Sequence, residues 1–494
     1  MARLATVVRS RPISSNETYR MAQDPSLLCL SELSQLLRRR QISPVELVRR
    51  FIDRIARLDP ALHCYNHVLI AESIKSARIA ERAIMEGKAA GPLAGIPVGI
   101  KDLIDVAGAP TTAQAIHLRN NVAAADAGVV RALRKAGVIV LGKQATAEYA
   151  VGGTQLDSHW PPPRNPWNLD LDTASSSSGS AAAVAAGLCA GAVGTDTSGS
   201  IRVPAAWCGV AGMMPTEGLV SRRGILPVSR TIDCVGPLAW TAEDCSLMLG
   251  AMLSDDPADT RLPGWRAPDF ASVTAPIRGL RVGVLRHYFE GDPNLDNDVR
   301  RATADTLKAL RARGAIIRDV RLSDFDTYST AARHISWPEE YAEHGPELEA
   351  FPGRFGAVTR SRLQDGKTIP AYDYIRASRR RHDLIVEIET VLRDIDVIVL
   401  PTISKPAQVL GYEHTELAKT TRWLTRPFNL TGSPALSVCN GFTPSGLPLA
   451  VQIIGRRYDD GTVLQVGHAV ETELATRARR PAIATSGAAA VASV

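Results

Sequence analysis

The chain has 494 residues, of which 45% are hydrophobic and 22% charged, a composition typical of a soluble globular protein. It contains no apolar run of the roughly 18 to 20 residues that a membrane span needs, and its net charge of +6 is too small to predict a nucleic-acid partner. Seven dispersed cysteines without a C-x-x-C pair favour buried thiols in a reduced, cytoplasmic setting over disulfides or zinc.

The N-terminal half alternates helices and strands. Residues 1–25 carry arginines but no apolar core of a signal peptide, which predicts a flexible arm. Apolar residues at three-four spacing predict helices through 30–58, with Ser43 as N-cap and Pro44 at the first helical position. The elements that follow are a strand at 96–102, a helix at 128–137, a strand at 138–143, a helix from Ser180, a strand at 191–196 and a helix beginning near Ser200.

The C-terminal half continues the alternation. Its predicted elements are a strand at 280–287, a helix at 296–314, strands at 315–322, 395–402, 434–442 and 449–455, and a helix at 463–471. Residues 325–392 lack strong strands and contain four prolines, so we expect a variable helical excursion around a substrate mouth. The tail at 481–494 has low complexity and is expected to be disordered. The alternation predicts one α/β domain over 26–480, with a mostly parallel sheet covered on both faces.

Two local patterns are similar to ligand-binding motifs, but in each the neighbouring residues argue against a ligand site. His63 and His67 are four residues apart, but no carboxylate ligand pattern accompanies them, so we predict no metal site. The stretch 137–144, GVIVLGKQ, has the G-x-x-x-x-G-K spacing of a phosphate loop, but Gln144 stands where Ser or Thr is required. Its middle residues are typical of a buried strand. We therefore predict neither a metal nor a cofactor.

Two serine clusters are the first candidates for chemistry: DTASSSSGSAAAVAAG at 172–187 and TDTSGS at 195–200. A serine run alone is typical of a loop, and Ser200 alone is typical of a helix cap. Ser200, however, stands between a predicted strand and a predicted helix, where unpaired backbone N–H groups favour negative charge. A serine oxygen at that place can attack a carbonyl while neighbouring N–H groups stabilise the oxyanion.

A serine nucleophile needs a base, and Lys101 is the candidate. The chain has no G-x-S-x-G elbow, which argues against the α/β-hydrolase route. Lys101 ends an apolar strand, and burial there lowers a lysine pKa because it disfavours the ammonium form. The other interpretation is structural, with Lys101 paired to Asp102 or Asp105.

Three segments together resemble the amidase signature family. They are GIPVGIKDLIDVAG (95–108), SSSGSAAAVAAGLCAGAVGTDTSGSIRVPAAWCGVAG (176–212) and FNLTGSPALSVCNGF (428–442), the last followed by LPLAVQIIGR. The resemblance covers roughly residues 28–475 of the chain. It implies an α/β/α sandwich around a mixed, twisted sheet of many strands.

The resemblance also implies roles for individual residues. Ser200 matches the family's nucleophile, Ser176 the bridging serine and Lys101 the base. The backbone N–H groups of Thr197, Ser198 and Gly199 are expected to form the oxyanion hole. Two structural features are also implied: a cis peptide bond between Ser175 and Ser176, and a salt bridge between Asp196 and Arg202 that braces the loop.

The chain departs from the family pattern at glycine positions. The family usually has G-G-S-S-G-G around the bridging serine, but Ala174, Ser175 and Ser178 replace glycines here, and Ser198 replaces one in the nucleophile loop. Each replacement adds a Cβ, limits positive φ and narrows the space near the acyl group. We therefore expect the loop geometry and the substrate preference to differ from those of relatives.

The sequence thus predicts an amidohydrolase that cleaves a carboxylic amide C–N bond, with aryl amides, esters and carbamates (urethanes) as further substrates of the same acyl-enzyme route. The expected partner is a small-molecule amide or carbamate, without nucleic acid or membrane, and a homodimer is left open. Two alternatives stand beside this prediction. One is the amidotransferase A-type subunit of a tRNA-charging complex, and the other is a catalytically inactive binding protein on the same scaffold.

Overall fold

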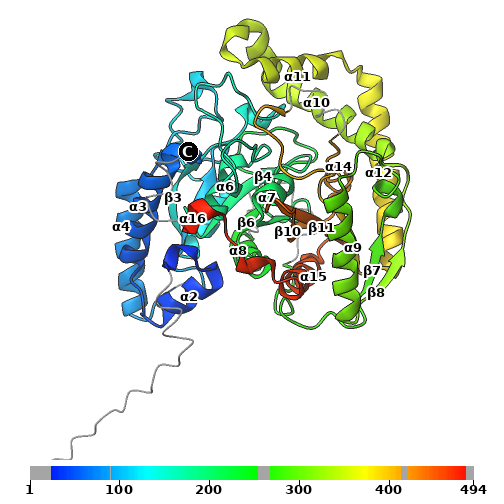
Figure 1. The fold of residues 1–494 in the computed structure, drawn as a ribbon. Coiled ribbons are helices and arrows are strands. Elements are labelled where there is room, and N and C mark those ends of the chain that lie inside the picture. The colour runs from blue at the N-terminus through cyan, green and yellow to red at the C-terminus, as the bar shows by residue number, and fades with distance from the viewer. Residues whose placement is uncertain (1–23, 90, 254–266, 413–420, 486–494) are drawn as a thin grey trace, which may run out of the picture.

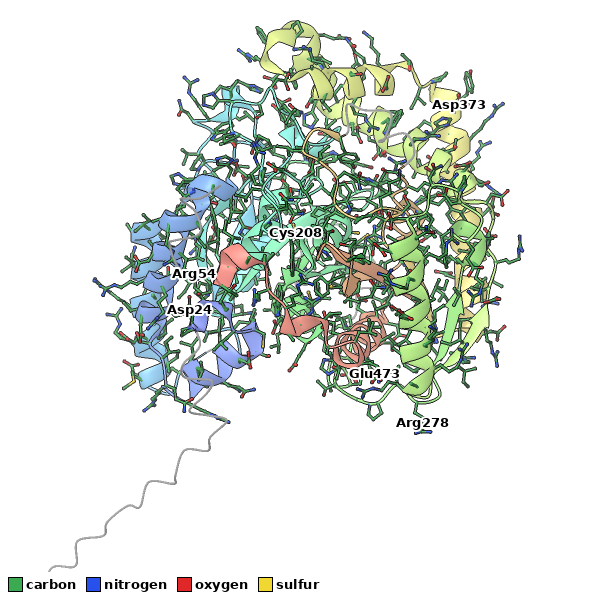
Figure 2. All side chains as sticks on the ribbon, viewed as in Figure 1. Asp24, Arg54, Cys208, Arg278, Asp373 and Glu473 are labelled. Atoms are coloured by element: carbon green, nitrogen blue, oxygen red, sulfur yellow. The ribbon has the colours of Figure 1, made fainter. Side chains whose placement is uncertain are left out.

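A computed structural model of the protein describes residues 24–89, 91–253, 267–412 and 421–485 (Figure 1). Most of the predicted N-terminal arm and tail lies outside these ranges. The described ends pack on the domain. Asp24 caps the 3₁₀ helix η1 (Pro25–Leu27) and lies beside Arg54, at 2.9 Å between Oδ2 and Nη1 (Figure 2). At the other end, the carbonyl of buried Ala484 accepts a hydrogen bond from Arg54.

The described strands form one sheet of 11 strands in the order β1-β3-β2-β4-β6-β5-β10-β11-β9-β7-β8. Their bounds are β1 Tyr65–Val68, β2 Pro97–Lys101, β3 Ile139–Gln144, β4 Gly191–Asp196, β5 Ala211–Met214, β6 Cys234–Ala239, β7 Arg281–Val284, β8 Ile316–Asp319, β9 Val397–Pro401, β10 Ala435–Phe442 and β11 Pro448–Gly455. The mixed sheet that the family resemblance implies is therefore present.

The prediction of a mostly parallel sheet is wrong. Parallel pairing is confined to two groups, β2 with β3 and β4, and β7 with β8 and β9. Between these groups β6, β5, β10 and β11 run in antiparallel pairs. For β10 and β11 the physical reason is the turn 443–447, which is too short for the crossover that parallel neighbours need. The sequence prediction also missed β1, β5 and β6.

Helices cover both faces of the sheet (Figure 1). The α-helices are α2 Leu30–Arg38, α3 Pro44–Leu62, α4 Ile70–Met85, α5 Gly128–Lys135, α6 Ser178–Ala185, α7 Arg202–Cys208, α8 Ala242–Met252, α9 Asn297–Ala312, α10 Phe325–Ala350, α11 Ala357–Thr368, α12 Ala371–Asp394, α14 Arg426–Thr431, α15 Asp460–Glu473 and α16 Ala482–Thr485. Short 3₁₀ helices are η2 Ile116–Leu118, η3 Glu148–Ala150, η4 Arg286–Tyr288, η5 Pro352–Arg354 and η7 Thr476–Ala478.

The alternation of side chains along β10 shows which helices lie on which face. Gly467 of α15 packs against Leu436. The next strand position, Ser437, pairs with Gly212 of β5, which faces Ala205 of α7. Because successive residues of a strand point to opposite faces, α7 and α15 cover opposite sides of the sheet. The fold is therefore the layered α/β/α sandwich that the resemblance implies.

Local sequence signals explain the helix boundaries. Ser43 accepts hydrogen bonds from the N–H groups of Val45 and Glu46, so it caps α3 as predicted, with Pro44 at the first position. The region 325–392 is helical, as expected, and consists of α10, η5, α11 and α12. These helices gather at one end of the molecule, at the upper right of Figure 1. The helix predicted from Ser180 begins two residues earlier, at Ser178.

Candidate active site

Lys101 lies at the carboxyl end of β2, an inner strand between β3 and β4, and its side chain is fully buried. β2 runs parallel to β4, with Ile100 paired to Val193, so both strands end at the same edge of the sheet. The residues that follow β4 are Thr197 to Ser200. The carboxyl edge of parallel strands is where α/β proteins commonly place their ligands. The parallel pairing therefore brings Lys101 to the serine turn.

The Lys101 amine contacts two hydroxyl groups. Its Nζ donates to Ser176 Oγ at 2.7 Å and to Thr195 Oγ1 at 2.8 Å. Burial lowers the pKa of Lys101 to about 7, while the negative charges of Asp196 and Asp233 act against this shift. A substantial fraction of Lys101 is therefore uncharged near neutral pH. An uncharged amine has a lone pair that can accept the Ser176 proton through the same contact.

The structural interpretation of Lys101, an ion pair with Asp102 or Asp105, is not what the geometry shows. Asp102 is paired instead with the buried Lys143, at 2.8 Å between Oδ1 and Nζ. It also accepts hydrogen bonds from Asn66 and Thr112. Lys143 belongs to the stretch 137–144, whose residues from Ile139 on form the buried strand β3. Its ammonium neutralises Asp102, so this G-x-x-x-x-G-K match is part of a strand and not of a phosphate loop.

The serine run lies in a tight buried loop between 172 and α6. The peptide bond between Ser175 and Ser176 is cis, as the resemblance implies. The N–H of Ser177 donates to the carbonyl of Ser200 at 3.0 Å, which joins the two serine clusters directly. The Ser177 hydroxyl donates to the carbonyl of Thr195 at 3.2 Å. The loop is therefore held against the end of β4.

The replaced glycines fall into two groups. Ala174 has a φ of +60°, in the left-handed region, whereas Ser175, Ser178 and Ser198 are not among the residues with positive φ. Serine therefore causes no backbone strain at those three positions. Ser178 starts α6, and its hydroxyl lies 3.5 Å from the carbonyl of Ala145. Ser175 and Ser198 instead line the cavity that contains Ser200.

The turn that carries Ser200 is organised by Asp196. The Asp196 carboxylate accepts hydrogen bonds from the N–H groups of Gly199 at 2.6 Å and Ile201 at 3.1 Å. It also forms the predicted ion pair with Arg202, at 3.0 Å between Oδ2 and Nε, with both side chains fully buried. The helix expected near Ser200 begins at Arg202, so Ser200 stands in the turn just before α7. This turn is held rigidly by one carboxylate.

The expected oxyanion hole needs one correction. The N–H of Gly199 already has an acceptor in Asp196, so it is not free to bind an oxyanion. Among the hydrogen bonds of the described residues, none uses the N–H of Ser198 or of Ser200. These two groups, next to the Ser200 hydroxyl, are the better donors for a developing negative charge.

Two residues beside the turn escaped the sequence prediction. Thr195 accepts from Lys101, and Asp233 accepts a hydrogen bond from the hydroxyl of Thr197. Asp233 also accepts from the N–H groups of Val228 and Ser229, so it ties the turn to the loop before β6. Asp233 is 33 positions from Ser200, and the sequence has no local signal for this contact because the strand pairing of β4 with β6 creates it.

Ser200 opens into a cavity of about 500 Å³. Its near wall holds Ser175, Thr197 and Ser198, and its far wall is built from α10, α11 and the segment 421–426. Residues of the helical region 325–392 therefore line the cavity that contains Ser200. Three features suit acyl transfer: the buried Ser200 hydroxyl in a braced turn, the backbone N–H groups of Ser198 and Ser200 beside it, and Lys101, whose lowered pKa and contact with Ser176 fit a base.

Two further findings concern ligands and membranes. Within the described ranges, no cluster of three or more His, Cys, Asp or Glu side chains has the arrangement of a metal site. The same ranges contain no helix with both the length and the apolar composition of a membrane span.

Comparison with known proteins agrees with the geometry. The Amidase family model matches residues 46–464. The A-type subunit of the glutamyl-tRNA(Gln) amidotransferase of Carboxydothermus hydrogenoformans is 34% identical, over 92% of this chain and 99% of the relative. The putative amidase AmiD of Mycobacterium tuberculosis is also 34% identical, over 93% of this chain and 96% of the relative.

A solved structure is similar to this chain in fold. It comes from a study of a vestigial protein complex and the evolutionary origins of an s-triazine catabolic enzyme, with a TM-score of 0.85, 29% identity, and coverage of 90% of this chain and 98% of that one. The family model, the relatives and the shared fold together show that this chain belongs to the Amidase family, the amidase signature enzymes.

Proposed function

We propose that the protein is a free-standing hydrolase of small amides that works through an acyl-enzyme on Ser200. The observation that carries the proposal is the buried Lys101, whose pKa is lowered to about 7 and whose Nζ contacts Ser176 at 2.7 Å. Structural lysines are usually exposed or paired with a carboxylate, and Lys101 has two hydroxyl partners instead.

The steps follow from the proton path. Neutral Lys101 takes a proton from Ser176, which takes one from Ser200, and the Ser200 oxygen attacks the amide carbonyl. A serine hydroxyl can relay in this way because it donates and accepts at once. The N–H groups of Ser198 and Ser200 hold the tetrahedral oxyanion. The proton then passes from the Lys101 ammonium through Ser176 to the leaving nitrogen, which restores neutral Lys101 and the Ser176 hydroxyl. Water then releases the acyl group and regenerates Ser200.

The same acyl-enzyme route accepts aryl amides, esters and carbamates, since each presents a carbonyl with a leaving group. Ser175 and Ser198 add hydroxyl groups to the cavity wall at positions where the family usually has glycine. These hydroxyl groups can form hydrogen bonds with a small-molecule amide in the cavity. They therefore favour a substrate preference that differs from that of relatives.

A second candidate function is that of an amidotransferase A-type subunit. The observation in its favour is the 34% identity to the Carboxydothermus hydrogenoformans protein over nearly its whole length. This function requires glutaminase activity and partner chains that receive the ammonia. The altered glycine pattern around Ser176 and the added hydroxyls at Ser175 and Ser198 weigh against it. Retention of Lys101, Ser176 and Ser200 weighs against an inactive binding protein.

The test is hydrolysis of a panel of acyl p-nitroanilides, together with labelling by a fluorophosphonate probe. Ser200→Ala should lose both hydrolysis, by at least about 10³-fold, and labelling. Ser378→Ala, at an exposed serine of α12, is the matched control and should behave like the unmodified protein. Equal rates for Ser200→Ala and the unmodified protein would refute the nucleophile. L-Glutamine hydrolysis together with co-purifying partner chains would support the amidotransferase instead.

A further inference from the structure

The far wall of the cavity is unusually rich in charge. Four arginines and two carboxylates line it: Arg333, Arg362, Arg422, Arg426, Asp326 and Glu340. Arg422 is exposed and lies 3.4 Å from Asp292, so it has a partner of its own. Asp326 is exposed as well. The interior of the wall is therefore formed by three arginines and Glu340.

Arg362 of α11 is held in place by an aromatic ring. Its guanidinium stacks over the Trp337 ring at 4.1 Å, and that of Arg333 lies 5.7 Å from the same ring. Stacking occupies the flat face of a guanidinium and leaves its N–H edge available for a ligand. Trp337 thus fixes the direction of the Arg362 donors without neutralising the charge.

Arg426 opens α14 and is more deeply buried. Burial and the neighbouring charges of Arg362 and Arg333 lower its pKa to about 10. Arg426 donates to the Ser329 hydroxyl at 3.4 Å, a long hydrogen bond. In the part of the chain that the structure describes, neither Arg362 nor Arg426 forms an ion pair with a carboxylate. Two half-buried cations thus line one cavity without an ion pair to a described carboxylate.

Glu340 lies between these arginines but does not pair with them. It is 6% exposed, and its Oε2 is buried without a hydrogen-bond partner. Burial is the main cause that raises the pKa of Glu340 to about 7. Among the described residues, Glu340 is the carboxyl in the interior of the wall, and it therefore supplies at most part of a negative charge at neutral pH.

A partly buried cation gains from an anion when no protein group already pairs with it. Arg362 and Arg426 are half-buried, neither forms an ion pair with a carboxylate of the described residues, and both line the cavity that contains Ser200. A planar guanidinium binds a carboxylate through two parallel hydrogen bonds. We propose that the substrate is a small amide that also carries a carboxylate, with the carboxylate bound by Arg362 and Arg426 and the amide carbonyl at Ser200. This proposal rests on the proposed hydrolase function and names its substrate class.

The test compares half-amides of dicarboxylic acids with neutral amides of the same length: succinamate, glutaramate and adipamate against butyramide, valeramide and hexanamide. The acids should be preferred in kcat/KM by about 10- to 100-fold, mainly through KM, because the arginines bind a group that does not react. The length of the half-amide with the highest kcat/KM reports the distance from Ser200 to Arg362 and Arg426, which with Arg333 form the arginine wall of the cavity. Added salt should raise KM for the acids more than for the neutral amides.

Variants of opposite sign separate recognition from damage to the fold. Arg362→Gln and Arg426→Gln should each reduce the preference for the acid over the neutral amide by about 10-fold or more. Glu340→Gln should increase it, because it removes a competing negative charge. Arg376→Gln, the same change at an exposed site on α12, is the control. A general structural defect would not produce opposite shifts at neighbouring positions.

Two negative outcomes can be told apart. A preference for neutral amides, or equal ratios in Arg362→Gln and the unmodified protein, would overturn the carboxylate site while fluorophosphonate labelling of Ser200 still supports the hydrolase. If the unmodified protein neither reacts with the fluorophosphonate probe nor hydrolyses any amide, the hydrolase function itself would be overturned. L-Glutamine carries a carboxylate too, and its hydrolysis, if reduced in Arg362→Gln, would support the carboxylate site within an amidotransferase.

Discussion

At the residue scale, the chemistry depends on one lysine whose surroundings differ from those of its neighbour in the sheet. Lys101 and Lys143 stand on adjacent strands and both are fully buried. Lys143 has a carboxylate partner in Asp102, whereas Lys101 has the hydroxyls of Ser176 and Thr195. An ion pair stabilises the charged form of a lysine, and a hydroxyl does so only weakly. Burial lowers the pKa of both lysines, but Lys101 has no carboxylate partner among the described residues and is therefore better suited than Lys143 to act as a base.

This difference predicts a pH profile. The base must be uncharged, so kcat/KM for a substrate without a titratable group should rise about tenfold per pH unit below the Lys101 pKa and level off above about 7. Lys101→Ala should reduce kcat/KM by about 10²- to 10⁴-fold and remove this rise. Lys367→Ala, at an exposed lysine, is the control. A flat profile between about pH 5.5 and 9 would contradict the assignment of Lys101 as the base.

At the element scale, the site depends on the turn between β4 and α7. Gly199 has a φ of +124°, which residues with a side chain rarely adopt. A Cβ at this position would lie 2.2 Å from Thr425 Oγ1. The Thr425 hydroxyl donates to the carbonyl of Ser198 at 2.6 Å, so it cannot move without releasing the turn. This explains why Gly199 remains glycine although Ser198 does not. Ser198 has no such conformation to maintain.

Gly199→Ala should therefore lower kcat by at least about 100-fold, because the shifted turn misplaces both Ser200 and the N–H groups of Ser198 and Ser200. The strained backbone should also cost about 1–3 kcal/mol of unfolding free energy. Gly250→Ala in α8 is the control, since a Cβ there meets its nearest atoms at 3.7 Å, an ordinary contact. Steady-state kinetics and urea unfolding measure the two effects. Unchanged kcat in Gly199→Ala would show that the turn tolerates the added Cβ.

At the scale of the whole molecule, Arg202 connects parts of the chain that are far apart in sequence. Its guanidinium pairs with Asp196 and also donates to Gln452 at 3.0 Å and to the carbonyl of Thr425 at 3.1 Å. Burial acts to raise the pKa of Asp196, but the charge and hydrogen bonds of Arg202 outweigh it and hold that pKa below its usual value. The serine turn is thereby anchored to β11 and to the segment before α14.

Arg202→Met should destabilise the protein by about 3–5 kcal/mol, because it leaves the Asp196 carboxylate buried without its cation. Urea unfolding followed by circular dichroism measures the change. Addition of Asp196→Asn to Arg202→Met should recover part of the loss, since the remaining amide carries no charge. A loss below about 1 kcal/mol in the single variant would mean that the network does not anchor the turn.

Some features were determined by the sequence alone. The local signals were strong where they depend on neighbouring residues, as in the cap at Ser43, the amphipathic helices of 30–58, and the buried strands that end at Lys101 and Asp196. The motif around Ser200 also indicated the amidase signature family, because its residues stand close together along the chain. The predicted contact between Lys101 and Ser176 and the salt bridge of Asp196 with Arg202 are both present.

Only the tertiary structure decided the rest. Strand direction depends on which strands become neighbours, so the antiparallel centre of the sheet escaped a prediction made from alternating elements. The same holds for the hydrogen bond from Thr197 to Asp233, and for the use of the Gly199 N–H by Asp196. The arginine wall comes from α10, α11 and α14, three helices that meet only in the folded chain. The catalytic residues of the Ser200 turn could be predicted because they stand next to one another in the sequence. The arginines of the cavity wall come from distant helices, so their proximity depends on packing, which a local sequence pattern does not indicate.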